Sequence, residues 1–262
     1  WEQCVAPKWV YPAAKSSEQL NFSNLLVSTV DSTRAVYVTE HLHRIGKSVL
    51  MVGEPGTAKT TTAQLFFDSC LHGQLLKTIN FSSATTMGMF QGTVEAELDK
   101  RGGKNFGPPG GKKMTVFLDD VSMPLVNDWG DQPTLECVRL IVEQGYFCFL
   151  DKDKRGEKKV CEDLQYLGGM GHPGGGRNDI PNRLKRHFFI FNLVLPSLTS
   201  INDIYGQMLE GRFPAKEFNA ATMSVVTMLT KATIDLWGTV KAKMLPTPAK
   251  FHYVFNMRDL SR

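Results

Sequence analysis

Short apolar runs alternate with amphipathic stretches along the first three quarters of the chain. The apolar runs predict buried strands at residues 48–52, 76–81, 114–118, 164–170 and 188–193. The stretches between them predict helices at residues 33–44, 60–71, 89–99 and 133–143. Strands that alternate with helices form a parallel sheet covered on both faces, so we expect an α/β fold with a five-stranded parallel sheet between helices.

Three further segments lie outside this alternation. Residues 101–113 are rich in glycine and proline and predict a loop or hairpin. Residues 145–161 alternate weakly about a charged turn and predict a second hairpin. Residues 1–15, rich in proline, lysine and aromatic side chains, are expected to form an extended entry arm.

The hydrophobic pattern changes after Pro196. Residues 197–262 show only helical periodicity, for example at Met223, Val226 and Leu229. We therefore predict two domains: a large α/β domain over residues 1–196, which includes the entry arm, and a small all-α domain over residues 197–262. The C-terminal end of the small domain could be missing from the chain.

A phosphate-binding loop is predicted between the first strand and the helix at residues 60–71. It consists of Gly53, Glu54, Pro55, Gly56, Thr57, Ala58, Lys59 and Thr60, with Thr61 following in the helix. Backbone N–H groups of such a loop and of the helix N-terminus point at phosphates. Lys59 supplies a cation, and the Thr60 hydroxyl can ligate Mg²⁺. Ala58 stands where the GxxxxGKS/T pattern has glycine, so its methyl group could alter the loop dihedrals.

Two acids follow the third predicted strand. In a P-loop protein, Asp119 would reach Mg²⁺ through a water molecule, and Asp120 would orient or deprotonate the attacking water. Asp120 is one methylene shorter than glutamate, and a positioning error on the order of an ångström can lower a rate about 100-fold. We therefore expect nucleotide binding more firmly than fast turnover. Alone, the acids could simply mark a polar loop, but the upstream P-loop favours the functional interpretation.

Composition narrows the function further. Hydrophobic residues make up 42% of the chain and the net charge is +4, with basic residues interspersed among acids, so neither membrane nor nucleic acid is expected as a partner. No apolar run reaches the roughly 18 residues that span a bilayer. The five scattered cysteines predict reduced thiols. The chain begins without Met, so we expect a piece of a longer protein.

Several segments together resemble dynein heavy chains. They are the P-loop, NFSSATT at 80–86, VFLDDVSMP at 116–124, WGDQ at 129–132, HPGGGRNDIP at 172–181 and LPTPAKFHYVFNMRDLSR at 245–262. The P-loop is shared by many ATPases, whereas the C-terminal run is far more specific. The resemblance covers nearly the whole chain and implies an AAA+ P-loop NTPase fold followed by a helical lid. The chain is most similar to the third AAA+ module of an axonemal heavy chain, because the first module usually has glycine before its lysine.

The resemblance also implies a ligand and further residues that bind it. ATP or ADP with Mg²⁺ would be bound, and Leu26, Val27 and Thr29 would lie near the adenine. AAA+ proteins often sense the γ-phosphate with an asparagine at the end of the fourth strand, where this chain has His172. A neutral histidine can still donate a hydrogen bond, and it would change charge near pH 6.5. A lone histidine is more often structural, and Asn178 is a second candidate.

The resemblance to dynein heavy chains also implies nucleotide-sensing roles for three arginines. Arg183 and Arg186 precede the fifth strand, from where an arginine finger reaches the nucleotide of the neighbouring module. They could equally be a solvated basic helix end, where cations suit the helix dipole. Arg258 matches the lid arginine that contacts the γ-phosphate and couples the lid angle to the nucleotide state, with a surface salt bridge as the alternative.

The resemblance implies a nucleotide-binding module that regulates a microtubule motor by passing its nucleotide state around a ring. Its partners would be adjacent AAA+ modules and the linker of the same heavy chain. Accessory chains and microtubules would be reached only through the full-length protein, in the cytoplasm and cytoskeleton of a cilium or flagellum. ATP hydrolysis to ADP and phosphate would be slow or dependent on the neighbouring module, with Asp119, Asp120 and Lys59 as catalytic residues.

Two other functions stay open from the sequence. Ala58, Asp120 and His172 depart from the best catalytic pattern, which favours a structural module that binds nucleotide without hydrolysing it. A clamp-loader type of AAA+ ATPase acting on DNA is the further alternative, and it would require salt-dependent DNA binding.

Overall fold

The computed structural model describes residues 4–12, 25–70, 72–174, 176–214, 216–250 and 252–260. Several predicted features therefore lie partly outside the described residues, namely residues 1–3 and 13–15 of the arm, Leu71 of the second helix, Gly175 of the glycine-rich loop, and Phe251, Ser261 and Arg262 of the C-terminal run. The described arm residues 4–12 form neither helix nor strand.

The chain divides into two compact units. The α/β unit comprises Val36–Glu54 and Ala58–Val194, and the helical unit comprises Trp1–Ala35, Pro55–Thr57 and Leu195–Arg262. The domain boundary at Pro196 stays a prediction.

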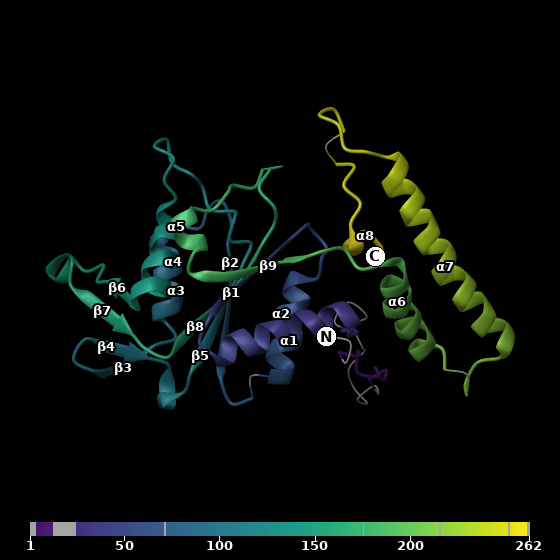
Figure 1. The fold of residues 1–262 in the computed structure, drawn as a ribbon, viewed down its shortest axis with the longest axis horizontal. Helices are drawn as coiled ribbons and strands as arrows, with labels where there is room; N and C mark the ends of the chain where they lie inside the picture. Colours follow the sequence, from purple (N-terminus) through teal and green to yellow (C-terminus); the bar gives the residue numbers. More distant parts are fainter. Residues whose placement is uncertain are drawn as a thin grey trace. The chain divides into compact units, whose positions relative to one another are not determined.

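A parallel sheet forms the centre of the α/β unit (Figure 1). Its strands are β1 (Ser48–Gly53), β2 (Leu75–Asn80), β5 (Met114–Asp119), β8 (Leu164–Met170) and β9 (Phe188–Leu193). Their order is β2-β5-β8-β1-β9, and every neighbouring pair is parallel. The five-stranded parallel sheet predicted from the sequence is confirmed. Since all five strands run the same way, their carboxyl ends lie along one edge of the sheet.

Helices cover both faces of this sheet because alternate strand residues face two different cores. Val49 and Phe117 pack with Phe66 of α2 (Lys59–Cys70), and the second half of α1 (Val30–Arg44) packs on the same side. Leu50 and Leu118 belong to the larger core on the opposite face. That core includes side chains of α3 (Met87–Glu95), α4 (Pro133–Gln144) and α5 (Asn182–Lys185).

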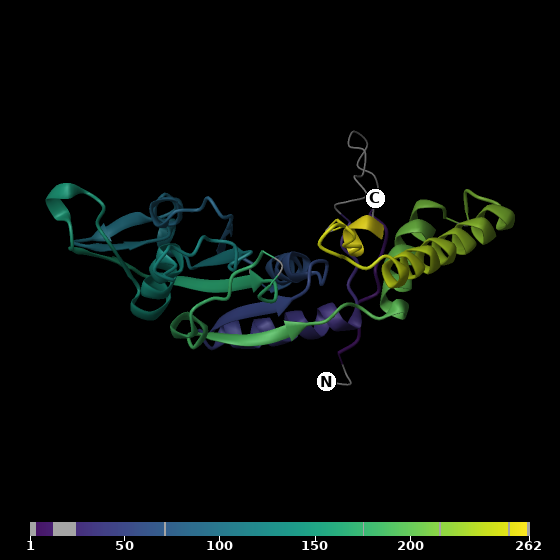
Figure 2. The ribbon, with the colours of Figure 1, turned by 90° about the horizontal axis from the view of Figure 1, so that it is seen from above.

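A second, smaller sheet joins two hairpins that are distant in sequence. Its strands are β3 (Asp99–Gly102), β4 (Asn105–Gly107), β6 (Tyr146–Cys148) and β7 (Lys158–Cys161), in the order β3-β4-β7-β6. Both hairpins are antiparallel, whereas β4 and β7 pair in parallel over two residues each. In both views this sheet extends from the side of the α/β unit that carries α3 and α4 (Figures 1 and 2).

The helical unit contains α6 (Leu198–Arg212), α7 (Ala220–Lys243) and α8 (Met257–Leu260). The first two pack against each other as a helical hairpin (Figures 1 and 2). Ser197 and Asn219 cap these two helices by accepting hydrogen bonds from backbone N–H groups of the first turn. No helix within the described ranges is long and apolar enough to cross a membrane.

Two helices begin two or more residues before their predicted starts because of capping. Helix α1 begins at Val30 instead of residue 33, since Thr29 and Ser32 exchange side-chain to backbone hydrogen bonds of 2.9 and 3.2 Å. Helix α3 begins at Met87, after Thr86 as N-cap, and ends at Glu95. The predicted end at residue 99 is wrong because that residue pairs in β3.

Candidate functional site

The turn between β1 and α2 has the backbone of a phosphate-binding loop. Gly56 and Ala58 have positive φ angles of 83° and 60°. An L-residue with a side chain loses about 1–2 kcal/mol in this left-handed conformation, so Ala58 is strained. Its carbonyl accepts a hydrogen bond of 2.7 Å from the Thr62 N–H, in the first turn of α2. The strained position is the one at which the P-loop pattern has glycine.

Lys59 lies at the start of α2 with its side chain folded over the loop. Only 9% of the residue is exposed. Its Nζ donates to the carbonyl oxygens of Gly53 and Glu54, at 3.0 and 2.9 Å. These bonds compensate the partial desolvation of the ammonium group and keep its charge beside the loop.

The next residue joins the loop helix to the end of β5. The Thr60 Oγ1 donates a hydrogen bond to the Asp119 Oδ2 at 2.6 Å. The other carboxylate oxygen, Oδ1, accepts from the Asp120 N–H at 3.0 Å. The structure thus brings together the hydroxyl and the acid that the sequence singled out as metal-side residues.

Gly169 of β8 provides the space for this pair, and the sequence interpretation missed it. A Cβ atom added at Gly169 would lie 3.1 Å from the Asp119 Oδ1 and 3.7 Å from the Lys59 Cβ. Its signal in the sequence is the Gly168-Gly169 pair inside an apolar strand, since glycine in a strand often marks the close approach of another group.

Asp120 turns away from the strand direction with a φ of 54°. Aspartate tolerates this region better than most residues, and its carbonyl accepts from the Met123 N–H at 2.9 Å. The residue is exposed, and its carboxylate has no hydrogen bond or ion pair within the described part of the chain. It can therefore polarise a water molecule at the carboxyl edge of the sheet.

The two candidate γ-phosphate sensors are placed differently. His172 is exposed just beyond β8. Asn178 is anchored to the loop after β5, because its Nδ2 donates to the Pro124 carbonyl at 2.9 Å and its N–H donates to the Ser122 carbonyl at 3.1 Å. The amide nitrogen of Asn178 is thereby occupied in holding two loops together.

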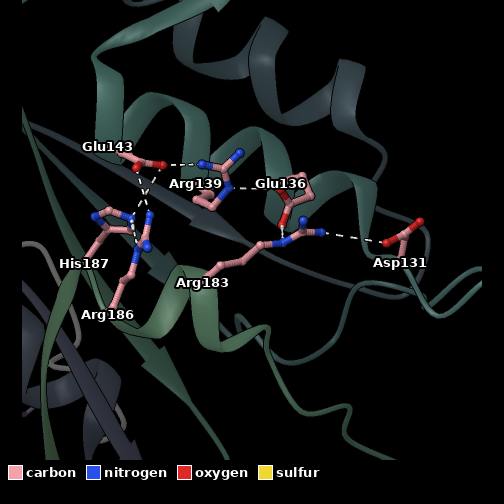
Figure 3. Close-up of polar contacts among 7 residues, drawn as sticks. All are labelled: Asp131, Glu136, Arg139, Glu143, Arg183, Arg186 and His187. Carbon is pink, nitrogen blue, oxygen red and sulfur yellow. Dashed lines mark hydrogen bonds and ion pairs between the residues drawn. The ribbon is translucent and has the colours of Figure 1, made fainter.

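The two candidate finger arginines are paired with acids of α4 (Figure 3). The Nε of Arg183 forms an ion pair of 2.6 Å with the Oε1 of Glu136. The Nη2 of Arg186 donates to the Oε1 of Glu143 at 2.9 Å. Between these two pairs, Arg139 of the same helix contacts both glutamates (Figure 3).

Two outer residues extend this ladder. The Nη2 of Arg183 lies 3.7 Å from the Asp131 Oδ1, and the His187 Nε2 lies 3.6 Å from the Glu143 Oε2. With histidine neutral, three arginines face three carboxylates, so the ladder is balanced in charge. Both finger candidates nevertheless keep half or more of the side chain exposed, 52% for Arg183 and 62% for Arg186.

The remaining predicted contacts belong to the helical unit. Val27 and Thr29 are buried and Leu26 is half-buried, and Thr29 caps α1. Arg258 is exposed on α8, where its N–H donates to the Asn256 Oδ1 at 2.8 Å. The adenine and γ-phosphate roles of these residues stay predictions.

The parallel sheet, the strand–loop–helix turn with its buried lysine and the threonine–aspartate pair define a P-loop domain. The family model described as "P-loop containing dynein motor region" matches residues 14–196. A second model, "AAA+ lid domain", matches residues 229–262.

Curated relatives agree with these matches. A "Dynein gamma chain, flagellar outer arm" from Chlamydomonas reinhardtii is 48% identical over 263 residues, which cover 100% of this chain and 6% of that protein. "Dynein axonemal heavy chain 5" from Rattus norvegicus is 49% identical over 266 residues, 100% of this chain and 7% of that protein. "Dynein axonemal heavy chain 8" from Mus musculus is 46% identical over 264 residues, with 100% and 6% covered.

The chain therefore belongs to the dynein motor-region family and is an AAA+ module with lid helices. It spans only 6–7% of the length of these relatives. The resemblance to axonemal dynein heavy chains and the P-loop fold predicted from the sequence are confirmed, whereas the assignment to the third module stays a prediction.

Proposed function

We propose that this module binds ATP or ADP together with Mg²⁺ at the carboxyl edge of the central sheet. The observation that carries the proposal is the 2.6 Å contact between Thr60 and Asp119, beside the buried Lys59 ammonium. The loop amides wrap the phosphates, and Lys59 supplies a positive charge that the backbone cannot.

The oxygen atoms at this site fit a magnesium ion. Mg²⁺ prefers hard oxygen ligands and keeps several water molecules. The Thr60 hydroxyl would hold it directly and the Asp119 carboxylate through water. When bound, the ion would neutralise charge on the phosphates. Because the two side chains already lie in hydrogen-bond contact, little rearrangement of the protein is needed to hold the ion.

Hydrolysis of ATP would be slow. Asp120 has an exposed carboxylate at the carboxyl edge of the central sheet. Its short side chain and left-handed backbone limit how far this carboxylate reaches toward the attacking water. Asp120 would orient the attacking water, while Lys59 would hold the phosphates. The strain at Ala58 and the exposure of His172 support an alternative, in which the module binds nucleotide as a structural element and does not turn it over.

In the heavy chain, the module would regulate the motor from the third position of the ring. Arg183 and Arg186 would serve the nucleotide of the preceding module, and Arg258 would report the γ-phosphate to the lid. Its partners would be the adjacent AAA+ modules and the linker, in a protein of the ciliary or flagellar axoneme. The names of the relatives and the lid match support an AAA+ module of an axonemal heavy chain, whereas the third position rests on Ala58 before Lys59.

Calorimetric titration of nucleotide tests the binding proposal. Lys59→Ala should weaken the binding of both ATP and ADP by roughly 10- to 100-fold, because a charge-assisted contact is lost. Lys100→Ala, which removes an exposed lysine from β3, is the matched control and should change neither. Unchanged affinity for both nucleotides in Lys59→Ala would refute the proposal.

Turnover separates the catalytic from the structural alternative. ATP hydrolysis is measured in the assembled ring with and without Asp120→Asn, because the finger for this site would come from the following module. A lower rate in the variant supports catalysis, and equal rates leave only the structural role. Binding to DNA near 50 mM salt would instead favour the clamp-loader alternative.

A further inference from the structure

A further arginine lies on the glycine-rich loop near the candidate site. Arg177 follows the glycine-rich loop after β8 and is half-buried. A Cβ atom added at Gly171 would lie 2.6 Å from both the Cδ and the Nε of Arg177, and 2.9 Å from its Cζ. The arginine side chain therefore lies across Gly171, in space that any other residue at position 171 would fill.

The face of β8 on which Arg177 lies follows from strand alternation. At position 169 an added Cβ would approach Asp119 and Lys59, whereas at position 168 it would approach Leu50 of the opposite core. Side chains two residues apart on a strand share a face. Gly171 is the first residue after β8, and with this alternation continued by one residue position 171 faces the same side as position 169, which is the side of the P-loop helix.

The distance along the strand places Arg177 beyond the metal-side pair. Two strand residues advance about 6.6 Å, so position 171 lies one step further toward the carboxyl edge than position 169. The strand register agrees, because Met170 pairs with Val52, directly before Gly53 at the start of the loop. The guanidinium is thus carried to the edge where the loop begins and where β5 delivers its two acids.

The backbone on both sides of Arg177 is fixed by hydrogen bonds. Arg177 and Gly174 exchange backbone bonds of 3.0 and 3.2 Å across a tight turn. Gly174 and Gly176 have φ angles of 114° and 85°, which only glycine adopts readily. The following Asn178 is bonded to the loop after β5. The loop therefore positions the arginine stem before any ligand arrives.

The chemistry of its side chain, and not the count of charges at this edge, favours an anionic partner for Arg177. Lys59 supplies one positive charge, against the two carboxylates of Asp119 and Asp120. Arg177 balances this count, and within the described residues its guanidinium has no ion pair or side-chain hydrogen bond. Guanidinium groups bind phosphate oxygens with two parallel hydrogen bonds.

We propose that Arg177 is a second phosphate-binding cation of this module, which contacts the terminal phosphate of ATP and thereby favours ATP over ADP. The inference rests on the proposed nucleotide site. The loop and Lys59 hold the inner phosphates, which ATP and ADP share, whereas Arg177 reaches the outer phosphate that only ATP has. Gly171 acts as a positioning residue, because its missing side chain leaves room for the arginine.

Calorimetry of the full 262-residue chain with Mg²⁺ and either ADP or a non-hydrolysable ATP analogue tests this inference. Arg177→Ala should weaken binding of the ATP analogue by about 10- to 100-fold and binding of ADP by less than about 3-fold. Arg177→Lys keeps the charge but loses the paired hydrogen bonds. Its affinity for the ATP analogue should lie between those of the unaltered chain and of Arg177→Ala. Gly171→Ala should reproduce the Arg177→Ala result, because the added methyl group displaces a flexible side chain.

The controls separate failure of this inference from failure of the nucleotide site. Arg155→Ala removes an exposed arginine from the turn between β6 and β7 and should change neither affinity. If Lys59→Ala weakens both nucleotides while Arg177→Ala and Gly171→Ala leave the ratio of the two affinities unchanged, the role of Arg177 is refuted and the nucleotide site stands. If the unaltered chain binds neither nucleotide, both proposals fall.

Discussion

Replacing Ala58 with glycine is expected to stabilise the protein, although most core and loop substitutions destabilise. Ala58 has a φ of 60°, in the left-handed region that disfavours any residue with a Cβ. Its carbonyl already accepts the Thr62 N–H that continues α2, so the conformation is held by the helix and would persist in the variant.

The size of the gain follows from two opposing contributions. Relief of the left-handed strain is worth about 1–2 kcal/mol. Glycine also has more freedom in the unfolded chain, which lowers the free energy of unfolding by about 0.5–1 kcal/mol. The difference is a net stabilisation of about 0–1.5 kcal/mol, or a rise in Tm of at most roughly 6 °C for a chain of this size.

Urea denaturation, with thermal melting as a second measurement, checks this value. Ala63→Gly is the control, in which the free energy of unfolding should change in the opposite direction, because Ala63 is 1% exposed inside α2. Glycine there should destabilise by about 1 kcal/mol or more. If Ala58→Gly lowered stability as Ala63→Gly does, the strain assigned to the loop would be refuted.

Three further predictions concern pH, the metal side of the site and the charge ladder. Burial, and secondarily a nearby lysine, lowers the folded-state pKa of His43 below 6.5. As the pH falls, the unfolded state therefore binds a proton at His43 before the folded state does. Stability should therefore decrease as pH falls below about 6.5, and the variant His43→Gln should lack this part of the slope in urea titrations. Gly169→Ala places a methyl group 3.1 Å from an Asp119 oxygen and should weaken Mg²⁺-dependent ATP binding, measured by calorimetry against Gly238→Ala, where the added methyl meets open space. Glu136→Gln should lower the free energy of unfolding by at most about 1 kcal/mol, because its ion pairs are partly exposed, and the loss should shrink at high salt.

Each of these three has a clear contrary result. An identical pH slope in His43→Gln would show that this histidine does not couple protonation to folding. Equal ATP affinity in the Gly169→Ala and Gly238→Ala variants would show that the space beside the acid is unimportant. A salt-independent loss in Glu136→Gln would show that packing, and not charge, holds the ladder.

The sequence was sufficient to predict the central sheet, because each strand is a short apolar run with breakers at its ends. Strands β8 and β9 have the predicted bounds, residues 164–170 and 188–193. It was insufficient for the small sheet, in which β4 and β7 pair in parallel over two residues each. Pairs that short leave no periodic pattern in the amino-acid sequence.

The candidate site was predictable where it depends on strand ends and not where it depends on loops. Thr60 and Asp119 meet because parallel strands deliver their carboxyl ends to one edge of the sheet. The position of Arg177 depends on how the glycine-rich loop folds back over Gly171, which no spacing reveals. The pairing of α4 with two arginines left a weak signal, since Glu136 and Glu143 stand seven residues apart on one helix face.

The junction between the two hairpins of the small sheet has a consequence for how related modules can diverge. Within the described residues, the strand pairing between the hairpins is limited to Asn105 with Val160 and Phe106 with Cys161, and side-chain contacts such as the Lys104–Glu157 ion pair lie beside it. Residues added to or removed from the tip between β6 and β7, at residues 151–156, would leave this junction and the register of the central strands untouched, and a longer surface loop adds little closure entropy. The tip between β3 and β4 is different, because the Lys104 carbonyl accepts a hydrogen bond of 2.9 Å from the Val160 N–H across the junction. Length variation among homologous modules should therefore accumulate at the tip between β6 and β7, where new surface can be acquired without disturbing the carboxyl edge of the central sheet.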